Sequence, residues 1–160
     1  MTVAEYNQCV DKFADGVYRF ILKNIKNEEH ARDIVQDAFA KMWEKAKDIS
    51  FSKSKAYLFT AAYHTMIDLI RKEKHKEDID KYMEAASTND NYSDLKEILD
   101  EAIEKLPDDQ RSVLMLRDYE GYSYQEIGEI TGLNESQVKV YIYRARVFLK
   151  NYLVSIDNVI

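Results

Sequence analysis

The sequence has little of the residue types that interrupt or cross-link a chain: its 160 residues include one proline, four glycines and one cysteine. Because proline and glycine disfavour helices more than any other residues, their scarcity indicates long helices with short connections. No dipeptide typical of a β-hairpin separates two alternating apolar segments. The composition therefore predicts an all-α fold.

The single cysteine, Cys9, excludes an internal disulfide and a cysteine-based zinc cluster, and it is typical of a protein in a reducing cytoplasm. Its apolar surroundings predict that it packs in the core. The N-terminal residues carry charges and lack an apolar stretch of signal-peptide length, and no segment is long enough to span a membrane. We therefore expect a cytoplasmic protein with no membrane span.

Catalytic motifs are also missing. His30, His64 and His75 are separated by irregular intervals that match no paired metal-ligand spacing. The sequence contains no glycine-rich phosphate loop and no serine or cysteine in a nucleophile motif. We expect no catalytic residue, no metal site and no cofactor.

The net charge of −6 argues against a general polyanion binder, but the charge is unevenly distributed. Residues 1–76 contain 14 lysines and arginines against 11 acids, whereas residues 77–93 contain one against five and residues 94–160 contain eight against 13. Within the acidic last part, residues 136–156 hold four cations and no acid. A basic stripe on an acidic body indicates a focused phosphate-binding face.

Apolar residues recur with helical spacing in two parts of the chain. Residues 1–76 predict one domain of three helices, near 3–23, 27–47 and 55–74, with Val10 and Trp43 among the side chains expected to face its core. Residues 77–93 are acidic and polar, which is typical of a flexible linker. Residues 94–160 predict a four-helix domain. We therefore expect two small helical domains joined by a flexible linker.

The segment from Ser123 to Tyr152 predicts a helix-turn-helix. Apolar residues keep a helical period on both sides of Gly132, which marks the corner between the two helices. Asn134 follows as a candidate cap of the second helix. Gly128 lies inside the first helix, where glycine costs about 1 kcal/mol against alanine, so we expect it to permit a close approach of the second helix.

The second helix of this motif has one apolar side and one polar, basic side. The polar side suits the major groove of DNA, with the cations on phosphates or guanine edges. The alternative is a solvated basic face on a core helix. Because the turn, the cap and the basic face coincide, we favour DNA binding by Ser136, Gln137, Lys139, Val140, Tyr143 and Arg144.

Two further segments permit a functional and a structural interpretation. Residues 53–76 combine lysines at both ends with aromatic residues, a composition that suits single-stranded DNA but equally fits a core helix. In the second helix, a polar patch of Asp33, Gln36 and Asp37 lies beside large apolar residues. Such a patch is either a protein-docking surface or a solvated helix face.

These motifs, in this order, resemble the extracytoplasmic-function (ECF) sigma factors of bacterial RNA polymerase over nearly the whole chain. Residues 31–45 resemble the family's second conserved region, which implies polymerase docking by Asp33, Gln36 and Asp37. Residues 51–74 resemble the part that recognises and melts the minus-ten element, and residues 106–149 resemble the region that reads the minus-thirty-five element. The resemblance implies promoter melting by Phe51, Lys53, Lys55, Tyr57, Arg71 and Lys72.

The resemblance implies a sigma factor that binds core RNA polymerase and promoter DNA, is a monomer when free, and in many family members pairs with an anti-sigma factor. Residues 1–76 would then bind polymerase and the minus-ten element, and residues 94–160 the minus-thirty-five element. The alternative from the motifs alone is a stand-alone dimeric helix-turn-helix regulator, which predicts a palindromic operator. A purely structural helical protein is disfavoured by the helix-turn-helix.

Overall fold

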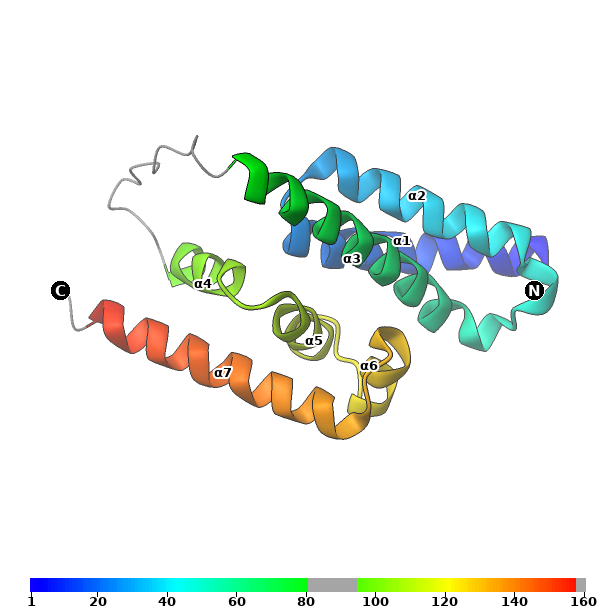
Figure 1. Ribbon diagram of the computed structural model, residues 1–160. Helices are drawn as coiled ribbons and strands as arrows, with labels where there is room; N and C mark the ends of the chain where they lie inside the picture. Colours follow the sequence, from blue (N-terminus) through cyan, green and yellow to red (C-terminus); the bar gives the residue numbers. More distant parts are fainter. Residues whose placement is uncertain (81–94, 158–160) are drawn as a thin grey trace.

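The computed structural model describes residues 1–80 and 95–157 (Figure 1). This part of the chain forms seven α-helices and two short 3-10 helices, with no β-strand among the described residues, so the all-α prediction is confirmed. The elements are α1 (Val3–Ile25), α2 (Glu28–Glu44), η1 (Ala46–Asp48), η2 (Phe51–Lys53), α3 (Ser54–Asp80), α4 (Leu95–Glu104), α5 (Asp108–Asp118), α6 (Tyr124–Thr131) and α7 (Glu135–Asp157).

Helices α1, α2 and α3 pack on one another and form the N-terminal unit (residues 1–80). Capping residues begin the first two helices: Thr2 forms a capping box with Glu5, and the Asn27 side chain accepts a hydrogen bond from the backbone of His30. The core between the helices is apolar. Its fully buried large side chains are Phe20, Ile21, Met42, Leu58, Phe59 and Met66.

Two side chains expected in this core lie outside it. Trp43 is 52% exposed and Val10 is 37% exposed, whereas their neighbours Met42 and Cys9 are completely buried. A helix turns about 100° per residue, and at these two places the neighbouring side chain takes the inward direction. The Trp43 ring instead packs edge-on against Tyr6, with the ring centroids 4.9 Å apart. The predicted core position of Cys9 is confirmed.

The third helix is longer than predicted. It continues to Asp80, so residues 77–80, which were expected to begin the linker, are helical. The absence of glycine and proline in this stretch explains why the helix does not end at its last apolar turn. The rest of the expected linker lies outside the described residues.

Helices α4 to α7 form the C-terminal unit (residues 95–157), in which α7 packs along α4, α5 and α6. Pro107 occupies the N-cap of α5, and a capping box of Ser123 and Glu126 begins α6. Gly132 ends α6 in the left-handed conformation, with φ of 81°, so the predicted corner of the helix-turn-helix is confirmed.

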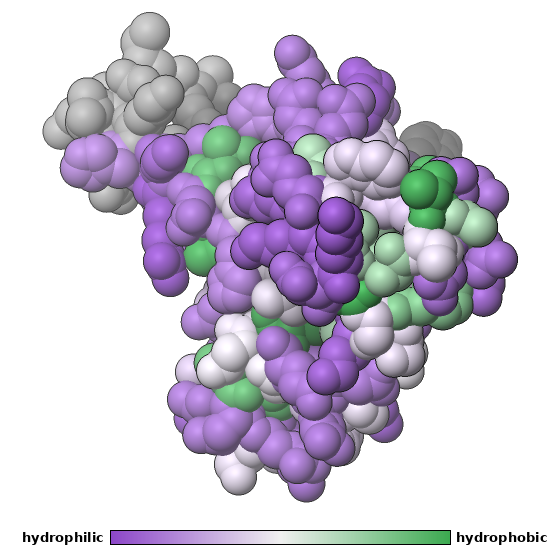
Figure 2. Space-filling view, turned by 90° about the vertical axis from the view of Figure 1, so that its right-hand side faces the viewer, coloured by the Kyte–Doolittle hydropathy of each residue, from purple (hydrophilic) through white to green (hydrophobic). Residues whose placement is uncertain are grey.

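The two units lie against each other. Helix α5 packs on α1 and α6 packs on α3, so segments more than 40 residues apart in sequence are side by side (Figure 1). Polar and charged residues dominate the face of the molecule seen in Figure 2, where apolar residues appear as small separate patches. The core extends across the contact between the units through Phe59 and Tyr122, whose rings meet with centroids 5.2 Å apart.

Gly128 fixes the geometry of the helix-turn-helix. A Cβ atom at this position would lie 2.8 Å from the backbone oxygen of Leu133, in the turn that leads into α7. The predicted close approach is therefore present, and its partner is the turn before the second helix. Gly16, inside α1, differs because a Cβ atom there would meet side-chain atoms at 3.5 Å or more.

We predict opposite effects for two matched substitutions. Gly128→Ala lowers the free energy of unfolding by about 1–3 kcal/mol, because the turn backbone has to move. Gly16→Ala raises it by up to about 1 kcal/mol, because alanine favours the helix and its methyl group fits. Urea denaturation of both variants measures the two changes. A Gly128→Ala variant as stable as Gly16→Ala would contradict the close approach.

Candidate nucleic-acid interface

The polar side of α7 forms an exposed surface that starts at the helix-turn-helix corner. All six predicted duplex-binding residues are exposed, and Tyr143 is 69% exposed. The opposite side of the helix is anchored in the core by Val138, Ile142 and Ala145, which are at most 2% exposed. The helix therefore presents one continuous outer face. Its members are Ser136, Gln137, Lys139, Val140, Tyr143 and Arg144.

Gln137 has a second role that the sequence did not indicate. Its backbone nitrogen donates a hydrogen bond to the Asn134 side-chain oxygen at 2.8 Å, and the Asn134 backbone nitrogen donates to Gln137 Oε1 at 3.1 Å. This reciprocal pair is a capping box that holds the first turn of α7. The predicted cap at Asn134 is confirmed, and the Gln137 oxygen is engaged in it.

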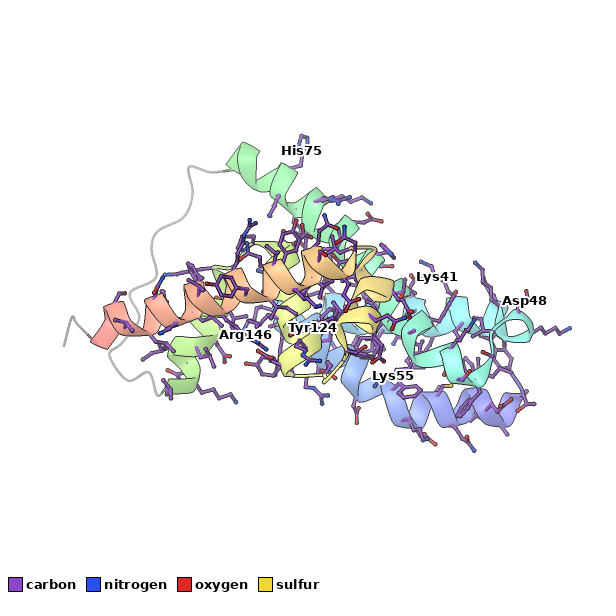
Figure 3. All side chains as sticks on the ribbon, turned by 90° about the horizontal axis from the view of Figure 1, so that it is seen from below. Lys41, Asp48, Lys55, His75, Tyr124 and Arg146 are labelled. Atoms are coloured by element: carbon purple, nitrogen blue, oxygen red, sulfur yellow. The ribbon has the colours of Figure 1, made fainter. Side chains whose placement is uncertain are left out.

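Ion pairs hold two cations of α7. Lys139 lies 3.7 Å from Glu135 and above the Tyr124 ring at 5.5 Å. Arg146 donates a 2.7 Å hydrogen bond to Asp118, and this bond is the main reason why the pKa of the guanidinium is raised. Figure 3 shows Arg146 and Tyr124 on neighbouring elements of the C-terminal unit. Arg146 therefore tethers α7 to α5.

The predicted melting residues fall into two groups. Phe51, Lys53, Lys55 and Tyr57 lie at or just before the start of α3. Arg71 and Lys72 are 14 or more residues further on, which is at least about 21 Å along the helix. Figure 3 shows this separation through Lys55, beside the C-terminal unit, and His75, at the far end of α3. The structure therefore does not bring all six residues together.

Within the first group the side chains differ in exposure. Lys53 is exposed, whereas Phe51 and Tyr57 are half-buried and pack against the core. Lys12 lies 5.9 Å above the Phe51 ring. The Lys55 ammonium lies 4.3 Å above the Tyr122 ring of the C-terminal unit. Both aromatic rings in this group are therefore partly committed to packing.

The predicted docking residues share the outer side of α2. Asp33, Gln36 and Asp37 are all exposed, and Asp37 pairs with Lys41 at 2.9 Å. A hollow of about 440 Å³ lies between α2 and α3 beside them. Its lining combines both acids with an apolar floor. The lining residues are His30, Asp33, Ile34, Asp37, Thr65 and Leu69.

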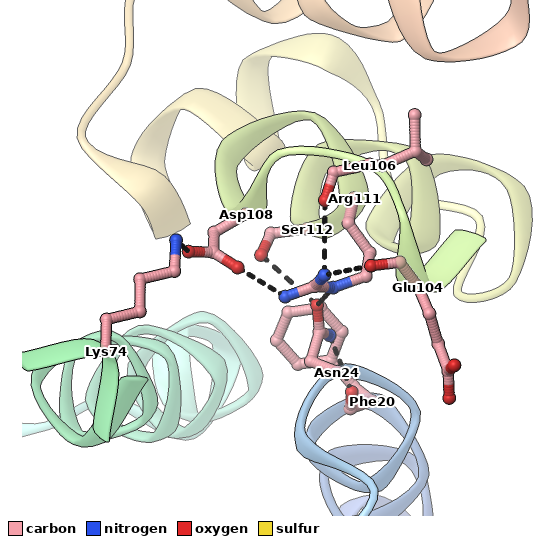
Figure 4. Close-up of polar contacts among 8 residues, drawn as sticks. All are labelled: Phe20, Asn24, Lys74, Glu104, Leu106, Asp108, Arg111 and Ser112. Atoms are coloured by element: carbon pink, nitrogen blue, oxygen red, sulfur yellow. Dashed lines mark hydrogen bonds and ion pairs between the residues drawn. The ribbon is translucent and has the colours of Figure 1, made fainter. Parts of the chain in front are cut away.

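A buried polar cluster joins the two units, and sequence reasoning missed it (Figure 4). Arg111 is 7% exposed. Its Nε donates a hydrogen bond to the Asn24 side-chain oxygen at 3.1 Å. Its Nη1 donates to the backbone oxygens of Glu104 and Leu106, both at 3.3 Å. Its Nη2 pairs with Asp108. Such a set of acceptors is what a buried guanidinium requires.

Asp108 also binds Lys74 of α3 at 2.6 Å. Burial on its own raises the pKa of Asp108, but the hydrogen bond from Lys74 and the charge of Arg111 outweigh it and hold the pKa below its ordinary value of 3.8. The carboxylate therefore stays charged at neutral pH and connects a cation from each unit. The sequence carries no signal for this cluster, because Arg111 follows Asp108, Asp109 and Gln110 in a polar first turn of α5.

Within the described residues, no group of three or more histidine, cysteine, aspartate or glutamate side chains is placed to hold a metal ion. None of the helices in that part of the chain combines the length and apolar character needed to cross a membrane.

Comparison with known proteins identifies both units. Residues 9–76 match the family described as Sigma-70 region 2, and residues 96–149 match Sigma-70, region 4. The chain is 30% identical over 156 residues to the ECF RNA polymerase sigma factor SigM of Bacillus subtilis, in a match that covers 94% of each chain. It is also 30% identical to RNA polymerase sigma factor SigV of the same species, covering 93% of this chain and 91% of that one.

A solved structure supports the same assignment. The sigma factor RpoE in complex with the anti-sigma factor NepR, from Bartonella quintana, superposes with a TM-score of 0.77 at 27% identity, covering 94% of this chain and 98% of that chain. The family resemblance seen in the sequence is confirmed, and the stand-alone dimeric regulator is not favoured. The chain belongs to the ECF sigma factors of RNA polymerase, and it directs transcription initiation at promoters.

Proposed function

We propose that this sigma factor holds promoter DNA at two surfaces and core RNA polymerase at a third, with no active site of its own. The observation that carries the proposal is the outer face of α7, which is exposed along its length and rigidly capped at the helix-turn-helix corner. A capped helix on a firm core can hold its side chains at a fixed position in a major groove. The polymerase supplies the chemistry.

The C-terminal unit reads duplex DNA at the minus-thirty-five element. Lys139 and Arg144 contact phosphates or guanine edges, and Ser136 lies at the first turn of α7, where the helix N-terminus favours a phosphate. Val140 and Tyr143 add apolar contacts, because both are exposed and face the same side as the cations. Gln137 acts mainly through the cap that positions this turn.

The N-terminal unit melts the minus-ten element by holding unpaired bases. Lys53 and Lys55 stand beside Phe51 and Tyr57, so cations for the backbone and aromatic rings for stacking lie at one end of α3. Trapping an unstacked base offsets an unstacking cost of a few kcal/mol. Arg71 and Lys72, on the exposed far half of α3, contact the duplex phosphates upstream.

Docking on core polymerase uses Asp33, Gln36 and Asp37. The two acids and the adjacent hollow with its apolar floor combine charge with a surface that a partner can bury.

We also propose that the free protein is a cytoplasmic monomer without cofactor. An anti-sigma factor is a further partner, since the structural relative RpoE was solved in complex with one.

The duplex-reading role predicts a selective loss. Lys139→Ala combined with Arg144→Ala removes two phosphate or base contacts. We therefore expect promoter-dependent transcription with core polymerase to fall at least tenfold. The salt dependence of promoter binding falls by about two counterions. Core binding stays unchanged. Lys96→Ala, an exposed cation on α4, is the control and retains activity. Equal transcription by the double variant and the control would exclude this role of α7.

The docking role predicts a loss of binding to core polymerase. Asp33→Ala with Asp37→Ala weakens binding to core polymerase at least tenfold, because two charge-assisted contacts are lost at the interface. Helix content in circular dichroism stays the same. Glu28→Gln, in the first turn of α2, is the control. If fluorescence anisotropy with labelled core polymerase gives the same affinity for the double variant and the control, these acids do not form the docking surface.

A further inference from the structure

Four apolar side chains form a surface patch at the end of the N-terminal unit where α1 begins and α2 ends (Figure 1). Val3 is 62% exposed, Val10 is 37% exposed and Trp43 is 52% exposed. Tyr6, half-buried, is three residues after Val3 and four before Val10, and residues at this spacing are neighbours on a helix surface. Single exposed apolar residues are common on proteins, whereas a contiguous group is typical of an interaction site. We call these four residues the apolar patch.

Two contacts hold the Trp43 ring in one orientation. The ring packs against Tyr6 with the centroids 4.9 Å apart and the ring planes at 70°. Tyr6 in turn packs edge-on against Phe39 at 6.3 Å, and its hydroxyl donates a 2.9 Å hydrogen bond to the Phe39 backbone oxygen. A side chain that is already positioned loses little conformational freedom when a partner covers it. Trp43 is therefore prepared for burial by a partner.

Trp43 lies on the same side of α2 as the proposed docking residues. It follows Gln36 by seven residues, which is two turns and about 10 Å along the helix. Ala40, which is exposed, lies between them. Asp33 is one turn before Gln36, and Asp37 directly follows it. The outer side of α2 is thus acidic at one end and aromatic at the other.

The two ends of this surface would contribute differently to an interface. Solvated charges mainly raise the rate of association and add little net affinity. Most of the binding energy of a stable interface comes from a few large side chains, tryptophan and tyrosine among them, that the partner buries. The docking residues Asp33, Gln36 and Asp37 include no such side chain. Trp43 is the one large apolar side chain of α2 that is exposed.

We propose that Trp43, backed by Tyr6, is the apolar anchor of the contact with core RNA polymerase, and that Val3 and Val10 complete the surface around it. The proposal rests on the proposed docking role of the outer side of α2. The matching polymerase surface has an apolar pocket for the indole ring, with cations beside it that face the acids of α2. Val3 and Tyr6 precede residues 9–76, so the match to Sigma-70 region 2 does not assign the part that they supply.

The anchor can be observed without removing it, because Trp43 is the only tryptophan of the chain. Replacing it by 5-hydroxytryptophan gives a fluorophore that absorbs at longer wavelength than the tryptophans of core polymerase. We expect core polymerase to shift its emission to shorter wavelength and to reduce its quenching by acrylamide at least about threefold, because an anchor ring becomes fully desolvated. Emission and quenching that stay the same in the complex would overturn the proposal.

Binding kinetics test the energetic role. We expect Trp43→Ala to dissociate from core polymerase about thirtyfold faster, as for a binding hot spot, with the association rate changed by less than about twofold. Trp43→Phe keeps an aromatic ring beside Tyr6 and loses less. The control is Leu95→Ala, at a 70% exposed apolar position of α4, which dissociates like the unaltered chain.

Surface plasmon resonance on immobilised core polymerase measures both rates, and urea denaturation verifies that the Trp43→Ala chain is folded. Equal dissociation rates for Trp43→Ala and Leu95→Ala would overturn the proposal.

The variant that combines Asp33→Ala with Asp37→Ala separates this result from the proposed docking role. We expect its loss mainly in the association rate, and more strongly at low salt. If this variant binds weakly while Trp43→Ala matches Leu95→Ala, the docking surface stands and the anchor is absent. If both variants bind core polymerase like Leu95→Ala, the contact lies elsewhere and the docking role fails together with the anchor.

Discussion

The hydrogen bonds of the buried Arg111 guanidinium set how the two units of this sigma factor sit. Arg111 reaches Asn24 on α1 and Asp108 on its own helix, and Asp108 in turn binds Lys74 on α3. A guanidinium buried in this way is stable only while its acceptors stay in place, so the cluster favours one relative placement of the units. That placement brings α6 onto α3 and Tyr122 onto Lys55.

The segment of α3 for which we propose strand binding is therefore also a contact surface between the two units. Its first turns present cations and aromatic rings that suit an unpaired DNA strand, and in the free chain they contact an acidic, aromatic surface of the C-terminal unit instead. The outer face of α7 points away from this contact and remains exposed. The proposed duplex-reading face of α7 is thus exposed in this arrangement, whereas part of the proposed strand-binding segment of α3 is covered by Tyr122.

Local patterns in the sequence were sufficient for the helices and the helix-turn-helix. Caps such as Asn27 and Asn134, and the corner at Gly132, depend on residues close in sequence, and each is where its pattern places it. The prediction for Trp43 was wrong because Met42, the residue before it, takes the inward direction at this turn of α2, and local pattern does not show which of the two does so. The contact between the units could not be predicted from the sequence, since Asn24 and Arg111 are 87 residues apart and neither belongs to a periodic pattern.

Small-angle X-ray scattering of the free protein tests the closed arrangement most directly. A chain of 160 residues folded as one compact body has a radius of gyration of about 15 Å, and that is the value we predict at low salt. A radius of gyration above about 20 Å for the free monomer would show that the units are already apart and would contradict the account.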